Sequence, residues 1–93
     1  MDSNIGVGEY RKKDYQEIYR LSEDKDNMEE TWEEWKANKN QALKDFQSMG
    51  FKTIDIIVTP QELVKYCREK GLKINGTSRA SFISFKVMML NKK

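Results

Sequence analysis

The chain of 93 residues contains no histidine and only one cysteine and one proline. Histidine is the commonest general base and a frequent metal ligand near neutral pH, so its absence argues against most acid–base and metal chemistry. The lone cysteine, Cys67, cannot form an internal disulfide, and without an imidazole to activate it the sequence indicates an inert core thiol. We therefore expect a cytoplasmic protein that is not an enzyme and has no metal and no cofactor.

Long apolar segments are also missing. The longest uninterrupted apolar run is Val87–Leu90, far below the roughly 20 residues that a membrane span needs. The opening residues Met1–Asn4 show neither the basic nor the apolar part of a secretory signal. We expect no membrane association. The composition, 38% hydrophobic and 34% charged, is typical of one small globular domain.

Acidic side chains are scarce in the second half of the chain. Residues 1–50 hold twelve acids and eight bases, whereas residues 51–93 hold three acids and nine bases. A basic half of this kind can contact nucleic acid or an acidic protein. It can equally face the acidic half within the fold or across a dimer, and the sequence leaves both interpretations open.

The spacing of apolar residues predicts a mainly α fold, α+β at the margin. Asp26 or Asn27 is expected to cap the second helix and Gly50 to end it. Thr59–Glu62 has the pattern of a capping box with proline at the first helical position, and Gly71 ends that helix. The expected elements are four helices at about 12–22, 28–49, 60–70 and 78–90 and one short strand at about 53–58.

The last segment admits a second interpretation. Thr77 or Ser78 is expected to cap a helix whose apolar side chains recur at three-four spacing, and we favour the helix. Residues 82–90 also fit a strand, because Ile83, Phe85, Val87 and Met89 alternate with their neighbours. The helical interpretation predicts a core made by Trp32, Trp35, Phe46, Leu63, Cys67, Ile83 and Val87, with the stem of Lys39 passing beside it to solvent.

The strand Thr53–Val58 needs a partner. Unpaired backbone N–H and C=O groups cost free energy when they are buried, and they pair with other chains when they are exposed. The candidates are a second copy of the same strand, the stretch Ile5–Val7, or residues 82–90. Residues 1–9 otherwise look like a flexible tail before a single small helical domain at 10–93. We expect a homodimer, and its expected interface residues are Ile54, Ile56, Val58, Phe82, Phe85 and Met89.

The basic half offers one candidate binding site. Asn75–Arg79 brings hydroxyl groups, an arginine and the free N–H groups of a helix start to one place, which is chemistry that can hold a phosphate. The same residues are also ordinary at the beginning of a helix. The candidate residues for binding nucleic acid or another anion are Lys65, Arg68, Lys70, Lys73, Thr77, Ser78 and Arg79.

The order of strand, proline-started helix, turn and serine-arginine-started helix resembles the ribbon-helix-helix family of DNA-binding proteins. The resemblance covers Thr53–Leu90 and is carried by Thr59–Leu63 and Thr77–Ser81. It implies that two strands pair across a dimer and place polar side chains in the major groove. Within 53–59 the strand offers Asp55 but no Arg, Lys, Asn or Gln to base edges.

Two functions are consistent with these patterns. The first is a small non-enzymatic intracellular interaction module that self-associates and binds another macromolecule; its protein partner is unknown. The alternative is a DNA-binding regulator that uses the basic C-terminal half. A protein-binding module should expose an apolar patch in the monomer, whereas a DNA binder should gather its bases on one face and lose affinity as salt rises.

Overall fold

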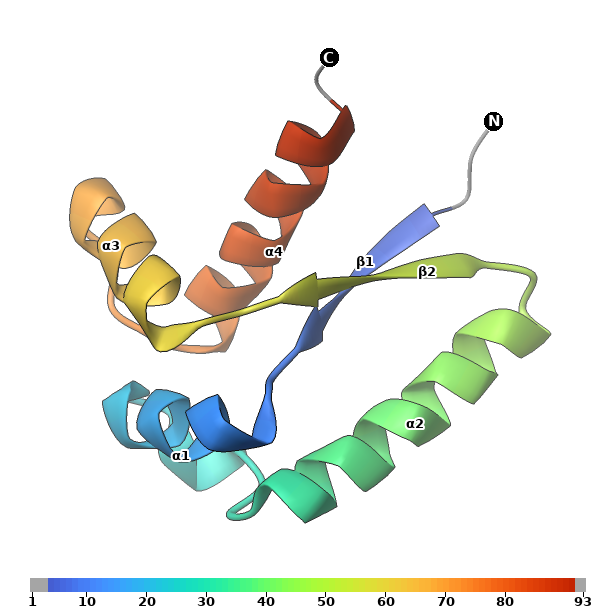
Figure 1. Cartoon of the computed structure of the whole chain (residues 1–93), viewed down its shortest axis with the longest axis horizontal. Helices are drawn as coiled ribbons and strands as arrows, with labels where there is room; N and C mark the ends of the chain where they lie inside the picture. The colour runs from blue at the N-terminus through green and yellow to red at the C-terminus, as the bar shows by residue number, and fades with distance from the viewer. Residues whose placement is uncertain (1–3, 92–93) are drawn as a thin grey trace.

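A mainly helical chain surrounds a two-stranded sheet in the computed structural model, which describes residues 4–91 (Figure 1). The prediction of four helices is confirmed, and no helix in this range is both long and apolar enough to cross a bilayer. The elements in order are β1 (Asn4–Glu9), α1 (Lys12–Leu21), the short 3-10 helix η1 (Lys25–Asn27), α2 (Trp32–Ser48), β2 (Lys52–Ile57), α3 (Pro60–Lys70) and α4 (Gly76–Asn91).

The two strands run parallel, with Asn4 opposite Lys52 at one end of a six-residue register. Of the three partners considered for β2, the N-terminal stretch is therefore the one that pairs with it. The expectation that residues 4–9 belong to a flexible tail is wrong, and residues 1–3 lie outside the described part of the chain. The family resemblance implies no intramolecular partner for the strand, whereas β2 pairs in parallel with β1 of its own chain.

Helix α4 packs closely against β1 because two glycines give it room. A β-carbon added at Gly6 would collide with Cγ2 of Val87, and one added at Gly8 would lie 2.9 Å from Cδ1 of Ile83. Glycine normally weakens a strand, which is why the sequence pattern concealed this one. Residues 82–90 lie within α4, so the helical interpretation of that segment is confirmed.

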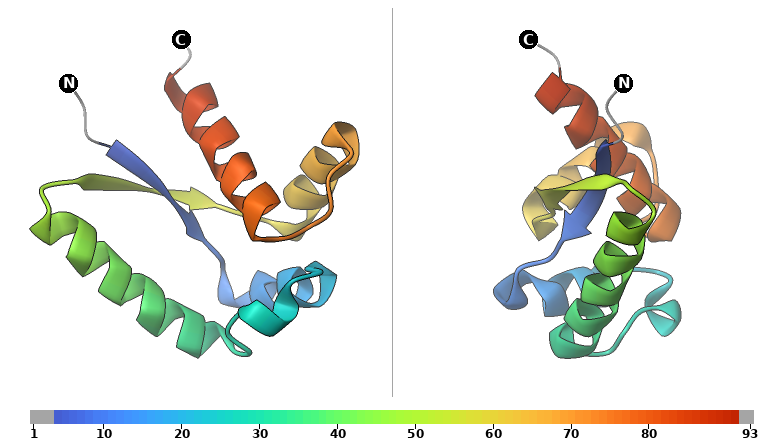
Figure 2. Two further views of the ribbon diagram at one scale, coloured as in Figure 1. Left: turned by 180° about the vertical axis from the view of Figure 1, so that it is seen from behind. Right: turned by 90° about the vertical axis from the view of Figure 1, so that its right-hand side faces the viewer.

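Helix α2 covers the opposite face of the sheet (Figure 2). Lys39 lies there almost fully buried and pairs with one carboxylate from each strand, Glu9 of β1 and, at 3.0 Å, Asp55 of β2. Its ammonium also lies 5.6 Å from the ring centre of Trp35. The expected passage of Lys39 to solvent is wrong, because two carboxylates hold the charge inside the fold.

The cap of α2 lies later than the sequence indicated. Asp26 and Asn27 belong to η1, and the side chain of Thr31 accepts the backbone N–H of Glu34 at 3.1 Å. The helix therefore begins at Trp32 instead of at about residue 28. The polar run forms the connection between α1 and α2 and includes the 3-10 helix η1. The residue whose side chain caps α2 is therefore Thr31.

Helix α3 matches the predicted bounds of 60–70, whereas the start of α4 differs from the prediction. Thr59 accepts the backbone N–H of Glu62 at 3.2 Å, and Gly71 ends the helix in the left-handed conformation with φ +68°. For α4 the capping side chain is Asn75, whose Oδ1 accepts the N–H of Ser78 at 3.0 Å. The expected caps Thr77 and Ser78 instead lie inside the first turn.

The core lies where α1, β2, α3 and α4 meet, and tyrosines supply more of it than expected. The hydroxyl of Tyr15 donates to the carbonyl of Glu29 at 2.6 Å, which allows the whole side chain to be buried. Leu63 and Cys67 are buried as expected. The buried cluster is Tyr10, Tyr15, Ile18, Val58, Leu63, Cys67 and Phe82; Trp32, Trp35 and Ile83 pack against it half-buried, and Phe46 and Val87 are not part of it.

Candidate functional site

The anion site expected at the start of α4 already contains an anion from the same chain. The carboxylate of Asp24 accepts two hydrogen bonds from the guanidinium of Arg79, both at 3.0 Å, and one from the backbone N–H of Gly76 at 2.9 Å. Arg79 also donates to the hydroxyl of Ser22 at 2.8 Å. The hydrogen bonds from Arg79 hold the pKa of Asp24 below its usual range.

The structure does not bring the seven candidate anion-binding residues to one place. Ser78 is buried and bonded to Asn75, and Arg79 is buried against Asp24, while Thr77 is exposed. The remaining four, Lys65, Arg68, Lys70 and Lys73, are exposed on α3 and the turn after it.

The exposed bases of α3 are spread around the helix and mixed with acids; Lys65 and Lys70 line one hollow together with Glu62 and Glu69. Lys65 and Lys70 differ by five positions, which turns them about 140° apart around a helix. Lys65 and Arg68 are closer together, but Glu62 and Glu69 lie on the same outer side of the helix. The positive charge of α3 is therefore interrupted by acids.

The predicted interface residues divide by burial. Ile56, Val58 and Phe82 are buried within the chain, so the structure places them in the interior of the monomer. Ile54 and Phe85 are half-buried, and Met89 is exposed.

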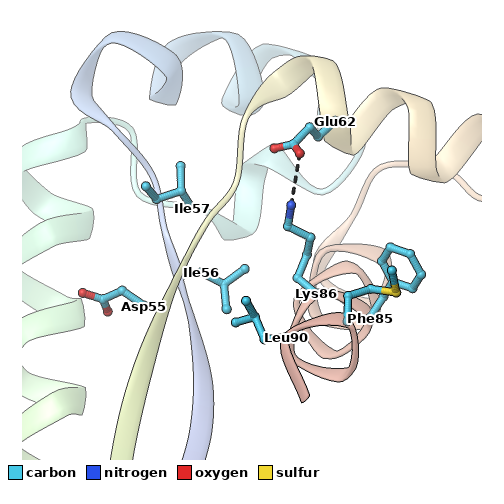
Figure 3. A pocket seen from close by; sticks show the side chains of 8 residues that line it. Asp55, Ile56, Ile57, Glu62, Phe85, Lys86 and Leu90 are labelled. Atoms are coloured by element: carbon cyan, nitrogen blue, oxygen red, sulfur yellow. Dashed lines mark hydrogen bonds and ion pairs between the residues drawn. The ribbon is translucent and has the colours of Figure 1, made fainter. Parts of the chain in front are cut away.

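A groove of about 490 Å³ opens beside β2, on the side of the sheet where α4 passes (Figure 3). Strand β2 forms one wall, α4 forms the other, and Glu62 of α3 closes one end by accepting a hydrogen bond from Lys86 at 3.1 Å. Lys86 holds the pKa of Glu62 below its usual range. The lining residues are Asp55, Ile56, Ile57, Glu62, Phe85, Lys86, Met89 and Leu90.

The backbone of β2 is unpaired along this groove. The N–H of Val58 donates to the carbonyl of Glu9 at 3.0 Å, and the N–H and C=O groups of a strand point to alternate sides. The backbone groups of Thr53, Asp55 and Ile57 therefore point away from β1. No other segment within residues 4–91 hydrogen-bonds to them. The site thus combines a row of free donors and acceptors with an apolar wall.

The free edge of β2 is suited to binding an extended chain. In residues 4–91 there is no group of three or more His, Cys, Asp or Glu side chains placed to hold a metal ion. The exposed fractions of Met89 and Leu90 are 49% and 56%, so the apolar wall formed by α4 is open to solvent, whereas the side chains of Asp55 and Ile57 lie on the other side of the strand (Figure 3).

Sequence reasoning found part of this site and missed the rest. It identified the strand edge as a candidate together with Ile56, Phe85 and Met89. It did not identify the other lining residues, Asp55, Ile57, Glu62, Lys86 and Leu90. The run of apolar residues at the end of α4 was the available signal. Comparisons with family models, with curated proteins and with solved structures found no match to this chain. The geometry of the groove and the edge is therefore the basis for a function.

Proposed function

We propose that this chain is a non-enzymatic interaction module that binds an extended segment of another macromolecule along the free edge of β2. The observation that carries the proposal is the position of the unpaired backbone groups of Asp55 and Ile57 directly beside the groove formed with α4. An added strand gains main-chain hydrogen bonds from such an edge, and every second side chain of the strand enters the groove.

The edge lacks the protection that most strands at the border of a sheet carry. Proteins cover such edges, shorten them, or place prolines and inward-pointing charges on them. Here no bulge interrupts the six pairs of β1 and β2. The charge of Asp55 does not guard the groove either, because its carboxylate is bonded to Lys39 on the opposite face. The apolar end of α4 beside the edge is exposed too, and contiguous apolar surface is typical of binding sites.

The test uses an eight-residue peptide in which valine and threonine alternate, labelled for fluorescence anisotropy. We expect saturable binding that is lost when the peptide is N-methylated on the side that faces β2. Met89→Lys should weaken binding at least tenfold, because it places a charge in the groove. Met49→Lys is the matched control, since Met49 is 61% exposed but does not line the groove. Equal binding of the N-methylated peptide would contradict the proposal.

DNA binding by the outer face of α3 is a second candidate. It is supported by Lys65 and Arg68, which are exposed and which, among the interactions of residues 4–91, take part in no ion pair. Anisotropy of a labelled duplex should then show affinity that falls steeply with salt and that drops in the Lys65→Ala/Arg68→Ala variant. Lys44→Ala, in the acidic half, is the control. An absence of binding even at low salt would eliminate this candidate.

The cytoplasmic location also remains part of the proposal. The only cysteine of the chain, Cys67, is buried and unpaired, which is typical of proteins from reducing compartments.

A further inference from the structure

We infer that the segment bound at the free edge of β2 is β2 of a second copy, so that two chains form a two-fold dimer with a continuous four-stranded sheet. The inference rests on the proposed function, because it uses the same edge and the same groove. It adds the identity of the partner, the direction of pairing and the register.

The hydrogen-bonding pattern of β2 is complementary to itself. The outward backbone groups belong to Thr53, Asp55 and Ile57 in both copies, and an antiparallel pairing brings donors of one copy to acceptors of the other. A two-fold axis perpendicular to the sheet also keeps both α4 helices on the same face. Such an interface closes on itself, so it ends at a dimer and leaves no free β2 edge.

The side chains of β2 match what the groove presents. Ile54, Ile56 and Val58 point toward the α4 face, because Ile56 and Val58 lie next to Gly6 and Gly8 on that side. Ile56 and Val58 are already buried by their own chain, so Ile54, which is half-buried, is the member of this set that a second β2 strand would bring to the partner's groove. Three of the seven large apolar side chains exposed within residues 4–91 lie on the last turns of α4: Met88, Met89 and Leu90.

The size of the sheet also favours a second copy. Parallel sheets are normally larger and enclosed, and three or more strands are usual for a stable sheet. A stable dimer buries about 800 Å² on each partner, which is about an eighth of the 6464 Å² that this chain exposes. The edge of β2 together with the exposed end of α4 combines unpaired backbone with apolar surface that could supply such an area.

The register follows from the side chains that would face each other. With Asp55 on the axis, two carboxylates would lie opposite and repel. With Ile54 on the axis, Lys52 would face Ile56. With Ile57 on the axis, Ile56 would face Val58, but only Ile57 itself would be paired within the strand. With Ile56 on the axis, Ile54 faces Val58 and Asp55 faces Ile57, so the α4 side of the junction is entirely apolar and the ladder is longer. The groove is centred on Ile56 as well, because Asp55, Ile56 and Ile57 are the β2 residues that line it.

Sedimentation velocity over a range of concentrations tests the dimer. We expect the mass of two chains for the native protein and for Met49→Lys, and the mass of one chain for Met89→Lys. Ile57→Pro should also give monomers, because it removes an outward N–H without touching the hydrogen bonds to β1. Circular dichroism checks that each variant is folded. A dimer that Met89→Lys and Ile57→Pro leave intact would overturn the inference.

Cysteine cross-linking tests the register in a Cys67→Ala background. Ile56→Cys should form a disulfide-linked dimer on oxidation, because residues on the axis of a non-hydrogen-bonded pair have α-carbons about 4.5 Å apart. Ile54→Cys is the matched control, since its two copies would lie about 14 Å apart. Cross-linking of Ile54→Cys in preference to Ile56→Cys would overturn the register.

The two proposals fail separately when peptide binding is measured at dilutions where the chain is a monomer, because the peptide and a second copy compete for the same edge. A monomer at every concentration that still binds the alternating peptide would overturn the dimer and leave the interaction module standing. A monomer that does not bind the peptide would overturn both.

Discussion

The carboxylate of Asp24 is hydrogen-bonded to the guanidinium of Arg79, which lies fifty-five residues further along the chain. The pair joins the connection after α1 to the first turn of α4. Because Asp24 also accepts the N–H of Gly76, it acts as a cap for a helix that is distant in the sequence. The carboxylate of Asp24 therefore balances the positive charge of Arg79 and of the N-terminus of α4 within the same chain.

Stability should fall in acid as Asp24 becomes protonated. Its pKa lies below the ordinary value of 3.8, mainly because of the hydrogen bonds from Arg79. The stabilising contribution is therefore fully present above the ordinary pKa and is lost as the pH falls through the lower pKa of the folded state. Asp24→Asn should reduce the free energy of unfolding by roughly 1.5–3 kcal/mol at neutral pH. Urea unfolding should show this difference shrinking below about pH 4.

The control for Asp24 is Glu17→Gln, which removes an exposed pair with Arg20. Exposed pairs of neighbouring residues stabilise little, so this variant should follow the native curve at neutral pH. A difference between Asp24→Asn and the native protein that stays constant down to pH 2 would contradict the assignment.

Replacing the buried Lys39 should destabilise the fold strongly. Lys39→Met keeps the volume but leaves Glu9 with only Lys36, at 3.1 Å, as a cationic partner. Loss of one partner from a buried ion pair costs about 3 kcal/mol. Urea unfolding of Lys44→Met, on the exposed side of the same helix, should change by less than about 0.5 kcal/mol.

A second substitution separates charge from packing at this position. Glu9→Gln combined with Lys39→Met should recover much of the loss, because the largely buried carboxylate that lost its partner is removed, while the carboxylate of Asp55 is 58% exposed and stays solvated. If the double variant is no more stable than Lys39→Met alone, packing and not charge dominates at this position.

Adding a methyl group to β1 should push α4 away from the sheet. Gly6→Ala brings its new β-carbon into collision with Val87, whose short branched side chain has little freedom to move. The expected loss is about 1–3 kcal/mol in the free energy of unfolding, measured by thermal or urea unfolding. Gly8→Ala is the matched control, because it meets the flexible end of Ile83. Equal losses at the two positions would show that close approach of the helix is not the cause.

The phenol of Tyr15 should titrate far above neutrality. Burial raises its pKa from the ordinary 10 to about 12. The folded state therefore favours the neutral form, and this contribution to stability is present below pH 10 and is lost as the pH rises from 10 through about 12. Difference spectroscopy of the phenolate should show a component near this pKa.

Tyr15→Phe should remove that component and cost about 1 kcal/mol at neutral pH, because the hydrogen bond to the Glu29 carbonyl is lost. Tyr66→Phe removes an exposed hydroxyl contact to Ser81 and should keep the component near pH 12. Loss of that component in Tyr66→Phe would show that it belongs to another residue.

Helix boundaries with strong local chemistry could be predicted from the sequence. The capping box at Thr59 and the stops at Gly50 and Gly71 depend on a few adjacent residues, and the structure has both glycines at positive φ. For β1 the sequence offered Ile5–Val7 only as one of three partners for β2, because the stability of this strand comes from β2 and α4 and its glycines lower strand propensity. The strand β1 is formed by contacts with β2 and α4, which lie far from it in the sequence.

The candidate site was predictable in its parts and not in its assembly. The free strand edge and the apolar last helix both follow from patterning, whereas the groove depends on how α4 crosses the sheet. The basic cluster failed for a related reason: Arg79 was paired with a residue that no local pattern connects to it. Helical spacing alone would have separated Lys65 from Lys70.

The parallel pairing of β1 with β2 has a consequence for how the chain folds. Asn4 pairs with Lys52, which lies forty-eight positions later in the chain. Closing a loop of that length costs conformational entropy before any hydrogen bond between the strands forms. Chains dominated by such distant contacts fold more slowly than helical bundles of the same length. During synthesis β1 leaves the ribosome before β2, and α4, which covers the glycines of β1, is made later than both. We therefore expect β1 to acquire its native contacts late in folding.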